Sequence, residues 1–281
     1  MNPELGLQLW SVRNSLQKDY AHTLEKVAEV GYRNLELICN PTPAGLVFGE
    51  DLQAEDLRKL LDKNGLRAVS CHFVPTPDMG FEAILDDLHV LGVDSLACAI
   101  AFFKDAPEVL EFCAQINRLA ETSKKAGVQF YYHNHYEEFQ VFGRHSVYDR
   151  LIKLLDKDLV KFEFDTYWAT RGGQDPIYWL KKLGPRCDLL HQKDLPADLK
   201  QVNLLERFGY DSEITLDTIM VTQDPNDYIE VGEGILNIPG FIEAARKYNH
   251  ARYIFIEQDM TKKTELESIA VSFDRMTRLL A

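Results

Sequence analysis

The segment LGLQLWSVRNSL (residues 5–16) decides between two α/β folds. Its first six residues form an apolar run typical of a buried strand, and the chain continues into SVRNSL without a glycine. A doubly wound sheet usually carries a glycine-rich phosphate loop directly after its first strand. Because that loop is missing from this segment, we favour a (β/α)8 barrel over a doubly wound sheet.

Eight such apolar runs alternate with amphipathic stretches along the chain. The seven further candidate strands are residues 34–39, 67–73, 94–100, 128–134, 160–165, 188–193 and 252–258. Helical patterns between them end at Gly31, Gly65 and Gly127, and glycine is a common helix stop signal. Eight strand–helix units in 281 residues predict an α/β TIM barrel that forms a single domain over residues 1–281. Residues 195–235, after the seventh strand, exceed a usual loop and are predicted to form a lid over the active site.

The composition limits the expected partners and location. The net charge is −13 and no Lys/Arg-rich run occurs, so we expect no nucleic-acid partner. No apolar run approaches the roughly 20 residues of a membrane span, and the N-terminus lacks a signal-peptide pattern, so we expect no membrane association. The five cysteines are widely separated, which predicts free thiols in a reducing cytoplasm.

Polar residues stand at the C-terminal ends of the predicted strands, where barrel active sites form. They are Gln8, Trp10, Glu36, His72, His133, His135, Asp165, His191, Lys193 and Glu257. Strand alternation predicts which of them face the barrel axis. Phe162 and Phe164 share one face of their strand, so Asp165 is expected to point inward. By the same alternation, Val69 is expected to face outward and His72 inward.

Inward carboxylates and imidazoles are costly to bury unless they are paired or bind a cation. Glu257, His133 and His135 also fall on inward faces, which gives a set of nitrogen and oxygen ligands. Such a set suits Mn²⁺, Zn²⁺, Co²⁺ or Fe²⁺ better than Ca²⁺, and Mg²⁺ is a further candidate. The sequence therefore predicts a divalent metal site.

Several motifs together resemble a known family. They are LGLQLWSVR (5–13), HNHYEEF (133–139), FDTYWATRGGQDP (164–176), HQKD (191–194), GEGILNIPGF (232–241) and FIEQD (255–259). In their order and spacing, the chain resembles the sugar phosphate isomerase/epimerase family of xylose-isomerase-like TIM barrels. Relatives in that family include tagatose and psicose epimerases, inosose dehydratase and isomerase, and endonuclease IV.

The resemblance implies a metal held by Asp165, His191 and Glu257, with a fourth ligand from the fifth strand. The epimerases have a glutamate three residues before an asparagine on that strand. Counting back from Asn134 reaches Tyr131, which cannot replace a carboxylate ligand. We therefore predict His135 as the fourth ligand; the alternatives are His133, Glu137 or a water molecule.

The resemblance further implies proton transfer next to a carbonyl of a small sugar or cyclitol, through a metal-stabilised enediolate. The catalytic candidates are Glu257, Glu137, His133 and Lys193, and the substrate-binding candidates are Gln8, Trp10, Glu36, His72 and Trp168. We predict an isomerase or epimerase. The first alternative is a lyase that dehydrates an inosose or acts on a 3-keto-glycoside.

Two other functions remain as weaker alternatives. One is a non-catalytic carbohydrate-binding barrel. The other is an endonuclease-IV-like phosphodiesterase, against which a low count of metal ligands and the charge of −13 both argue. Relatives often form dimers or tetramers, so a homo-oligomer is compatible with the resemblance.

Overall fold

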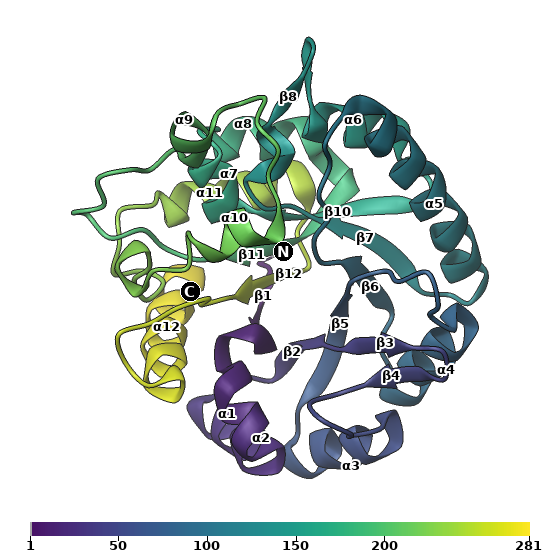
Figure 1. The fold of residues 1–281 in the computed structure, drawn as a ribbon. Coiled ribbons are helices and arrows are strands. Elements are labelled where there is room, and N and C mark those ends of the chain that lie inside the picture. The colour runs from purple at the N-terminus through teal and green to yellow at the C-terminus, as the bar shows by residue number, and fades with distance from the viewer. Residues whose placement is uncertain (1) are drawn as a thin grey trace.

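The computed structural model describes residues 2–281 and contains a closed barrel of eight parallel strands inside a ring of helices (Figure 1). The barrel strands are β1 (Glu4–Gln8), β2 (Asn34–Ile38), β5 (Arg67–Phe73), β6 (Ser95–Cys98), β7 (Gln129–His133), β10 (Val160–Asp165), β11 (Cys187–Gln192) and β12 (Tyr253–Ile256). They pair around the barrel in chain order, and β12 closes it against β1. The predicted (β/α)8 barrel is therefore confirmed.

Helices follow the strands and cover the outside of the barrel (Figure 1). They are α1 (Arg13–Lys18), α2 (Tyr20–Val30), α3 (Ala54–Asn64), α4 (Phe81–Leu91), α5 (Ala106–Lys125), α6 (Val147–Leu154), α7 (Thr166–Arg171), α8 (Pro176–Leu183), α9 (Leu204–Phe208), α10 (Leu216–Met220), α11 (Ile238–Ala244) and α12 (Glu265–Leu280). Two short antiparallel ribbons, β3 (Asn40–Thr42) with β4 (Gly45–Val47) and β8 (Val141–Phe142) with β9 (His145–Ser146), extend from the loops.

The helix ends follow the local sequence. The side chain of Asp19 accepts a hydrogen bond from the backbone N–H of His22 and so caps the start of α2. The same helix stops at Gly31, whose φ of 123° is rarely adopted by residues with a side chain. Gly65 ends α3 in the left-handed conformation, as its sequence position predicts.

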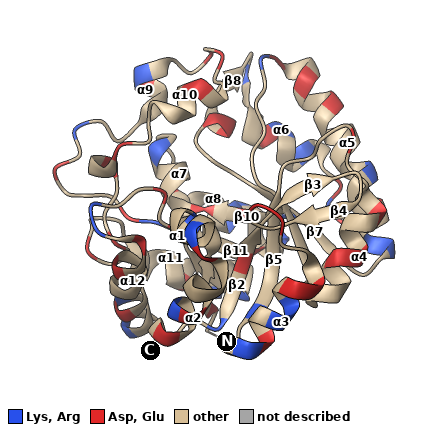
Figure 2. Cartoon of the chain, turned by 60° about the horizontal axis from the view of Figure 1, so that its bottom comes forward, with Lys and Arg blue, Asp and Glu red and all other residues tan. Residues whose placement is uncertain are grey.

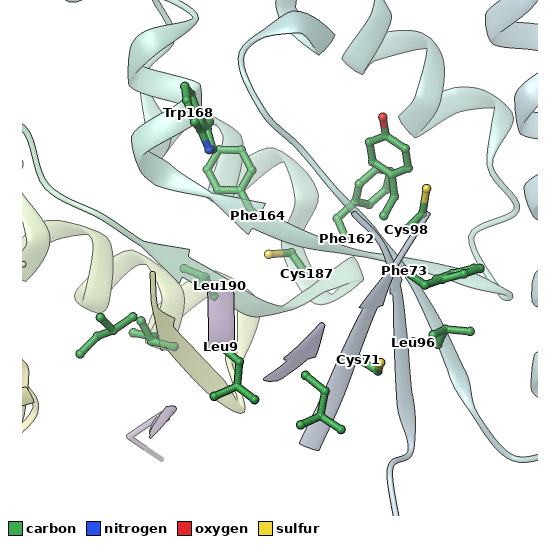
Figure 3. Packing of buried hydrophobic residues seen from close by; sticks show 14 of the residues in the cluster. Leu9, Cys71, Phe73, Leu96, Cys98, Phe162, Phe164, Trp168, Cys187 and Leu190 are labelled. Carbon is green, nitrogen blue, oxygen red and sulfur yellow. The ribbon is translucent and has the colours of Figure 1, made fainter. Parts of the chain in front are cut away.

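Two apolar cores lie on the two faces of the barrel wall. The outer core packs the strands against the helices and includes Phe162 and Phe164, which are seen among the buried side chains of Figure 3. The inner core fills the barrel below the strand ends and consists of Val69, Ala97, Tyr131, Leu189, Tyr253 and Phe255. Gly6 makes room for the Phe255 ring, because a Cβ on residue 6 would lie 2.4 Å from its Cδ1.

The prediction that Val69 faces the helices is wrong. The register of β2 against β5 shifts at this point: Leu35 pairs with Ala68, but Glu36 pairs with Ser70. Val69 is the extra residue at this irregularity, and it joins the inner core. Such a register shift depends on the neighbouring strand and leaves no mark in the alternation of a single strand.

The segment 195–235 contains α9 and α10 and is held at its base by Asp194. The carboxylate of Asp194 accepts hydrogen bonds from the backbone N–H groups of Gly232, Gly234 and Leu236 at 2.9–3.0 Å. A Cβ on residue 234 would lie 2.4 Å from Asp194 Oδ1, so glycine is needed there. That this segment closes over the active site as a lid stays a prediction.

Charged residues are distributed over the helices of the outer ring. Figure 2 shows acidic and basic residues interspersed along these helices, without a continuous basic face in this view. None of the helices within residues 2–281 combines the length and apolar character that a membrane crossing requires.

Candidate active site and metal centre

The polar residues predicted at the strand ends lie together inside the barrel, in two layers. The inner cluster lies zero to two residues before the strand ends and consists of Glu36, His72, His133, Glu163 and His191. The outer cluster lies at or just beyond the strand ends and consists of His135, Asp165, Lys193, Glu257 and Asp259. The inner core of the barrel separates both clusters from its N-terminal end.

Lys193 is the centre of the outer cluster. Its ammonium donates to Asp165 Oδ2 at 2.7 Å and to Glu257 Oε2 at 2.5 Å, and the side chain is 1% exposed. Burial alone would lower the pKa of Lys193, but Asp165 and the other surrounding carboxylates raise it above its usual value. Lys193 is therefore a fixed positive charge between two buried carboxylates.

The two carboxylates are held differently. Asp165 is the N-cap of α7, where its Oδ1 accepts a hydrogen bond from the backbone N–H of Trp168 at 2.8 Å. Glu257 follows β12 and faces both Lys193 and His191. Burial would raise the pKa of Glu257, but the charges of Lys193 and His191 outweigh it and keep the carboxylate ionised.

His191 connects the two layers. Its Nδ1 lies 2.8 Å from Glu257 Oε2 in the outer cluster, and its Nε2 lies 2.5 Å from Glu36 Oε2 in the inner cluster. Burial lowers the pKa of His191, yet Glu163 and the other carboxylates around it raise that pKa well above its usual value. Both nitrogens of this ring are therefore committed to acidic partners.

His135 is the accessible imidazole of the outer cluster. Its side chain is 18% exposed, its ring lies 5.3 Å from that of Trp168, and its Nδ1 has no hydrogen-bond partner within residues 2–281. Burial and the nearby Lys193 lower the pKa of His135 to about 3, so the ring is neutral. The neutral ring can accept a proton, but its low pKa makes it a weak base.

Glu137, a catalytic candidate from the sequence, lies behind His135. It is fully buried in a 3-10 turn, with its Oε1 3.9 Å from His135 Nδ1. Burial and the neighbouring Glu138 raise the pKa of Glu137 well above its usual value. Glu137 therefore contacts the site through His135.

A divalent ion fits one set of these side chains. Ligand atoms of His133, Asp165, His191 and Glu257 all lie within 4.8 Å of one another. His135, the fourth ligand predicted from the sequence, is not in this set, and His133 takes its place. Two imidazoles with two carboxylates are a common donor set for zinc and similar metals.

Lys193 competes with such an ion for the same oxygens. Asp165 Oδ2 and Glu257 Oε2 both accept from its ammonium, so an ion bound there must displace Lys193 from at least one of them. The residues fit the ion in type and spacing, and the lysine balances the charge of the two carboxylates when no ion is bound.

Most of the substrate-binding candidates are buried. Glu36 and His72 belong to the inner cluster, Gln8 donates to Glu36 Oε2 at 2.7 Å, and Trp168 is 1% exposed. Trp10 is 43% exposed, and the guanidinium of Arg13 lies 4.5 Å from the centre of its ring. Of the five candidates, only Trp10 presents an open surface beside the strand ends.

The sequence analysis did not predict two acidic residues of the site, Glu163 and Asp259. Glu163 lies two residues before Asp165 on the same inward face, so strand alternation already indicated its direction. Asp259 ends the FIEQD motif, and its Oδ2 accepts a hydrogen bond from the Tyr228 hydroxyl at 3.2 Å. Burial raises the pKa of Asp259 to about 7, although Lys193 opposes that shift.

Two cavities flank the clusters. One of about 150 Å³ opens at the ends of β1 and β12 and is lined by Asp259, Arg13 and Ser11 among others. The other, of about 350 Å³, lies between α7 and the segment 195–235, with Arg171 in its wall. None of the four possible metal ligands lines either cavity.

Comparison with known proteins agrees with this geometry. The family model described as "Xylose isomerase-like TIM barrel" matches residues 24–276, which is most of the chain. The chain belongs to the xylose isomerase-like TIM barrel family. Within curated proteins, it is similar to an inosose dehydratase of Mesomycoplasma hyopneumoniae, with 25% identity over 99% of this chain and 92% of the relative.

Solved structures share the fold of this xylose isomerase-like barrel. A sugar phosphate isomerase/epimerase from Parabacteroides distasonis superimposes with a TM-score of 0.79 at 23% identity, covering 100% of this chain and 96% of that one. The IolI protein, whose structure contains a bound zinc atom, superimposes with a TM-score of 0.68 at 13% identity, covering 100% and 98%.

Proposed function

We propose that this chain is a divalent-metal-dependent enzyme that moves a proton next to a carbonyl of a sugar or cyclitol. The observation that carries the proposal is the buried ligand set of His133, Asp165, His191 and Glu257 directly beside the unpaired imidazole of His135. Membership in the xylose isomerase-like family supports it. The inosose dehydratases among the relatives and the zinc bound to the IolI protein support the substrate class and the metal.

Each side chain of the site has its own role in the proposed proton transfer. His133, Asp165, His191 and Glu257 would hold the ion, which would polarise the substrate carbonyl and acidify the adjacent C–H. His135 would accept the proton at its other ring nitrogen, Nε2, because its Nδ1 is buried and faces Glu137. The ammonium of Lys193 stabilises the negative charge that develops on the enediolate oxygen.

Dehydration is the outcome that this arrangement favours. The inward positions of β7 and its extension carry Tyr131, His133 and His135, so no carboxylate from this strand faces Glu257. Tyr131 instead donates to Asp188 Oδ1 at 2.8 Å, in the direction of the opposite end of the barrel. With one imidazole base, the imidazolium formed by removal of the α-proton can return that proton to the departing β-oxygen, which leaves as water from an inosose or as the alcohol from a 3-keto-glycoside.

Isomerisation or epimerisation is the second candidate. His135 follows β7 and Glu257 follows β12, and both approach the outer cluster from different sides of the barrel. If Glu257 returns a proton to the enediolate, the net reaction is a shift or inversion without loss of water. The two outcomes share the first step and differ in the fate of the intermediate.

Incubation in deuterated buffer tests the proposal and separates the two outcomes. A panel of inososes, keto-sugars and 3-keto-glycosides is incubated with Mn²⁺, Zn²⁺ or Co²⁺ and followed by NMR and mass spectrometry. Loss of water, or of the alcohol from a 3-keto-glycoside, identifies a lyase, and deuterium on carbon without either loss identifies an isomerase or epimerase. If no substrate does either, the proposed proton transfer is refuted.

A matched pair of histidine variants tests the role of His135. His135→Gln should abolish exchange at carbon while it retains the metal content of the wild type. His145→Gln, at an exposed position in the β8–β9 ribbon, should leave both unchanged. Loss of metal in His135→Gln would instead make His135 a ligand, as the sequence suggested.

A further inference from the structure

The inner cluster holds more metal-binding groups than the outer ion needs. Ligand atoms of His72, His133, Glu163 and His191 form a second set within 4.8 Å of one another, and all four residues are buried. Two of them, His72 and Glu163, are absent from the set assigned to the outer ion. We propose that the inner cluster is a second metal site for a transition-metal dication such as Zn²⁺ or Co²⁺, with the rings of His133 and His191 shared between the two sites as imidazolates, each of which releases its N–H proton to solvent when both ions bind.

The geometry is close to that of a four-coordinate site. Glu163 Oε2 lies 2.5 Å from His72 Nε2, 3.5 Å from His191 Nε2 and 3.6 Å from His133 Nδ1. Ligand atoms around tetrahedral zinc are about 3.3 Å apart, as follows from bonds of about 2.0–2.1 Å. Movements of less than about 1 Å would therefore convert these contacts into coordination distances.

Unpaired buried atoms point to a missing partner in this layer. His133 Nδ1, Glu163 Oε1 and Glu36 Oε1 are buried and have no hydrogen-bond partner in residues 2–281. Leaving such atoms unpaired costs about 1–3 kcal/mol each. An ion in the inner cluster would use His133 Nδ1 directly and both oxygens of a carboxylate, which removes most of that cost.

The charges of the inner cluster match a dication. Glu36 and Glu163 bring two negative charges into a fully buried layer. The rings of His72 and His191 stack beside these carboxylates with centroids 5.0 Å apart and planes 8° apart. One dication between the rings and the carboxylates would supply two positive charges from a single centre.

His191 can serve both sites because its two nitrogens face opposite layers. Its Nδ1 lies 2.8 Å from Glu257 Oε2 in the outer cluster, while its Nε2 faces Glu36 and Glu163. Glu36 accepts from Gln8 at 2.7 Å, which fixes its orientation beside His191. The competing explanation is that the inner cluster only orients the ligands of an outer ion by hydrogen bonds.

Metal stoichiometry distinguishes the two explanations without substrate. The full chain is stripped with a chelator, reloaded with Zn²⁺ or Co²⁺, and analysed by inductively coupled plasma mass spectrometry and visible Co²⁺ spectroscopy. We expect two ions per chain in the wild type, one in His72→Asn and one in Asp165→Asn. His22→Asn, which removes an exposed histidine on α2, should retain two.

Three other metal contents would distinguish an inner site from an outer one. One ion in the wild type that is lost in Asp165→Asn but kept in His72→Asn refutes the inner site and leaves the proposed function intact. One ion that is lost in His72→Asn but kept in Asp165→Asn supports the inner site and removes the metal from the proposed reaction. No bound ion in the wild type refutes both. Circular dichroism verifies folding, and Glu163→Gln replaces His72→Asn if that variant is unfolded.

Discussion

Lys193 carries the charge balance of the outer cluster. Its ammonium is 1% exposed and bonds to Asp165 and Glu257, so Lys193→Met leaves two buried carboxylates uncompensated. We expect the free energy of unfolding to fall by about 3–5 kcal/mol in the presence of a chelator, because an unpaired buried charge is that costly. Urea denaturation followed by circular dichroism measures the change.

A surface lysine provides the control for this substitution. Lys182 pairs with Asp149 at 2.6 Å, but both side chains are about a third exposed. Lys182→Met should therefore cost less than about 1 kcal/mol. Equal losses in the two variants would show that Lys193 is not an essential counter-ion. Saturating Zn²⁺ should restore part of the stability lost in Lys193→Met, because the ion replaces the missing charge.

The imidazole of His135 makes the folded chain sensitive to acid. Its pKa is about 3 in the folded state against 6.5 for an ordinary histidine, so below pH 6.5 the unfolded chain binds a proton that the folded chain does not. Stability therefore falls as the pH falls, by about 1.4 kcal/mol per pH unit for this one group. From pH 6.5 to about pH 5, the metal-free wild type should lose about 2 kcal/mol more than His135→Gln. Urea titrations at the two pH values test this difference, and parallel losses in both proteins would contradict it.

Strand alternation predicted the direction of the site residues but not their depth in the barrel. Asp165 and Glu257 were recognised because they end strands and point inward. Glu163 points inward as well, yet it lies one layer deeper and was not predicted as a site residue. His133 and His135 share an inward face, and the choice between them as ligand depends on how β7 is staggered against its neighbours. That stagger is a property of the closed barrel rather than of any one strand.

At the scale of elements, all eight strands were predicted, and their ends lie within about two residues of the observed ones, which is the usual precision of such boundaries. The register shifts were not predicted. In addition to the shift at Val69, a second shift occurs between β10 and β11, where Phe162 pairs with Cys187 but Glu163 pairs with Leu189. Asp188 lies at this shift and contacts Tyr131 and Lys161. Such irregularities arise where strands of different twist must close a ring, so local sequence does not specify them.

The segment 195–235 depends on Asp194 for its attachment. Asp194→Ala removes a carboxylate that accepts from Gly232, Gly234 and Leu236, while Lys193 and the metal ligands remain in place. Hydrogen bonds to a charged group contribute about 1.5–3 kcal/mol each, so protection of these amides from hydrogen exchange should fall by at least about tenfold. Exchange mass spectrometry measures it.

The amides of α2 and α5 serve as the internal control for that experiment. They lie in long helices away from Asp194 and should keep their protection. A uniform loss over the whole chain would mean that Asp194 stabilises the barrel rather than the segment. If segment 195–235 closes over the site, the variant should also admit substrate faster and hold it less tightly.

At the scale of the whole molecule, the number of possible metal ligands no longer argues against a phosphodiesterase. The sequence suggested few metal ligands. The two clusters together contain five carboxylates: those of the predicted ligands Asp165 and Glu257, and those of Glu36, Glu163 and Asp259. The net charge of −13 still argues against a phosphodiesterase that binds DNA. Basic residues are interspersed with acidic ones on the helices of Figure 2. The absence of a nucleic-acid partner stays a prediction.

Metal binding should stabilise the whole barrel, because its ligands come from strands that are distant in sequence. His133, Asp165, His191 and Glu257 follow or end β7, β10, β11 and β12, so an ion held by them ties together half of the ring. An ion at 100 times its dissociation constant adds about 2.7 kcal/mol to the folded state. In a chain of this size that raises the melting temperature by about 5 °C. Differential scanning calorimetry of the chelated and Zn²⁺-loaded protein measures the shift, which Asp165→Asn should reduce because it loses a ligand. A wild type that melts at the same temperature with and without the ion would show that these four residues bind no metal, and Lys193 would then be the permanent cation of the site.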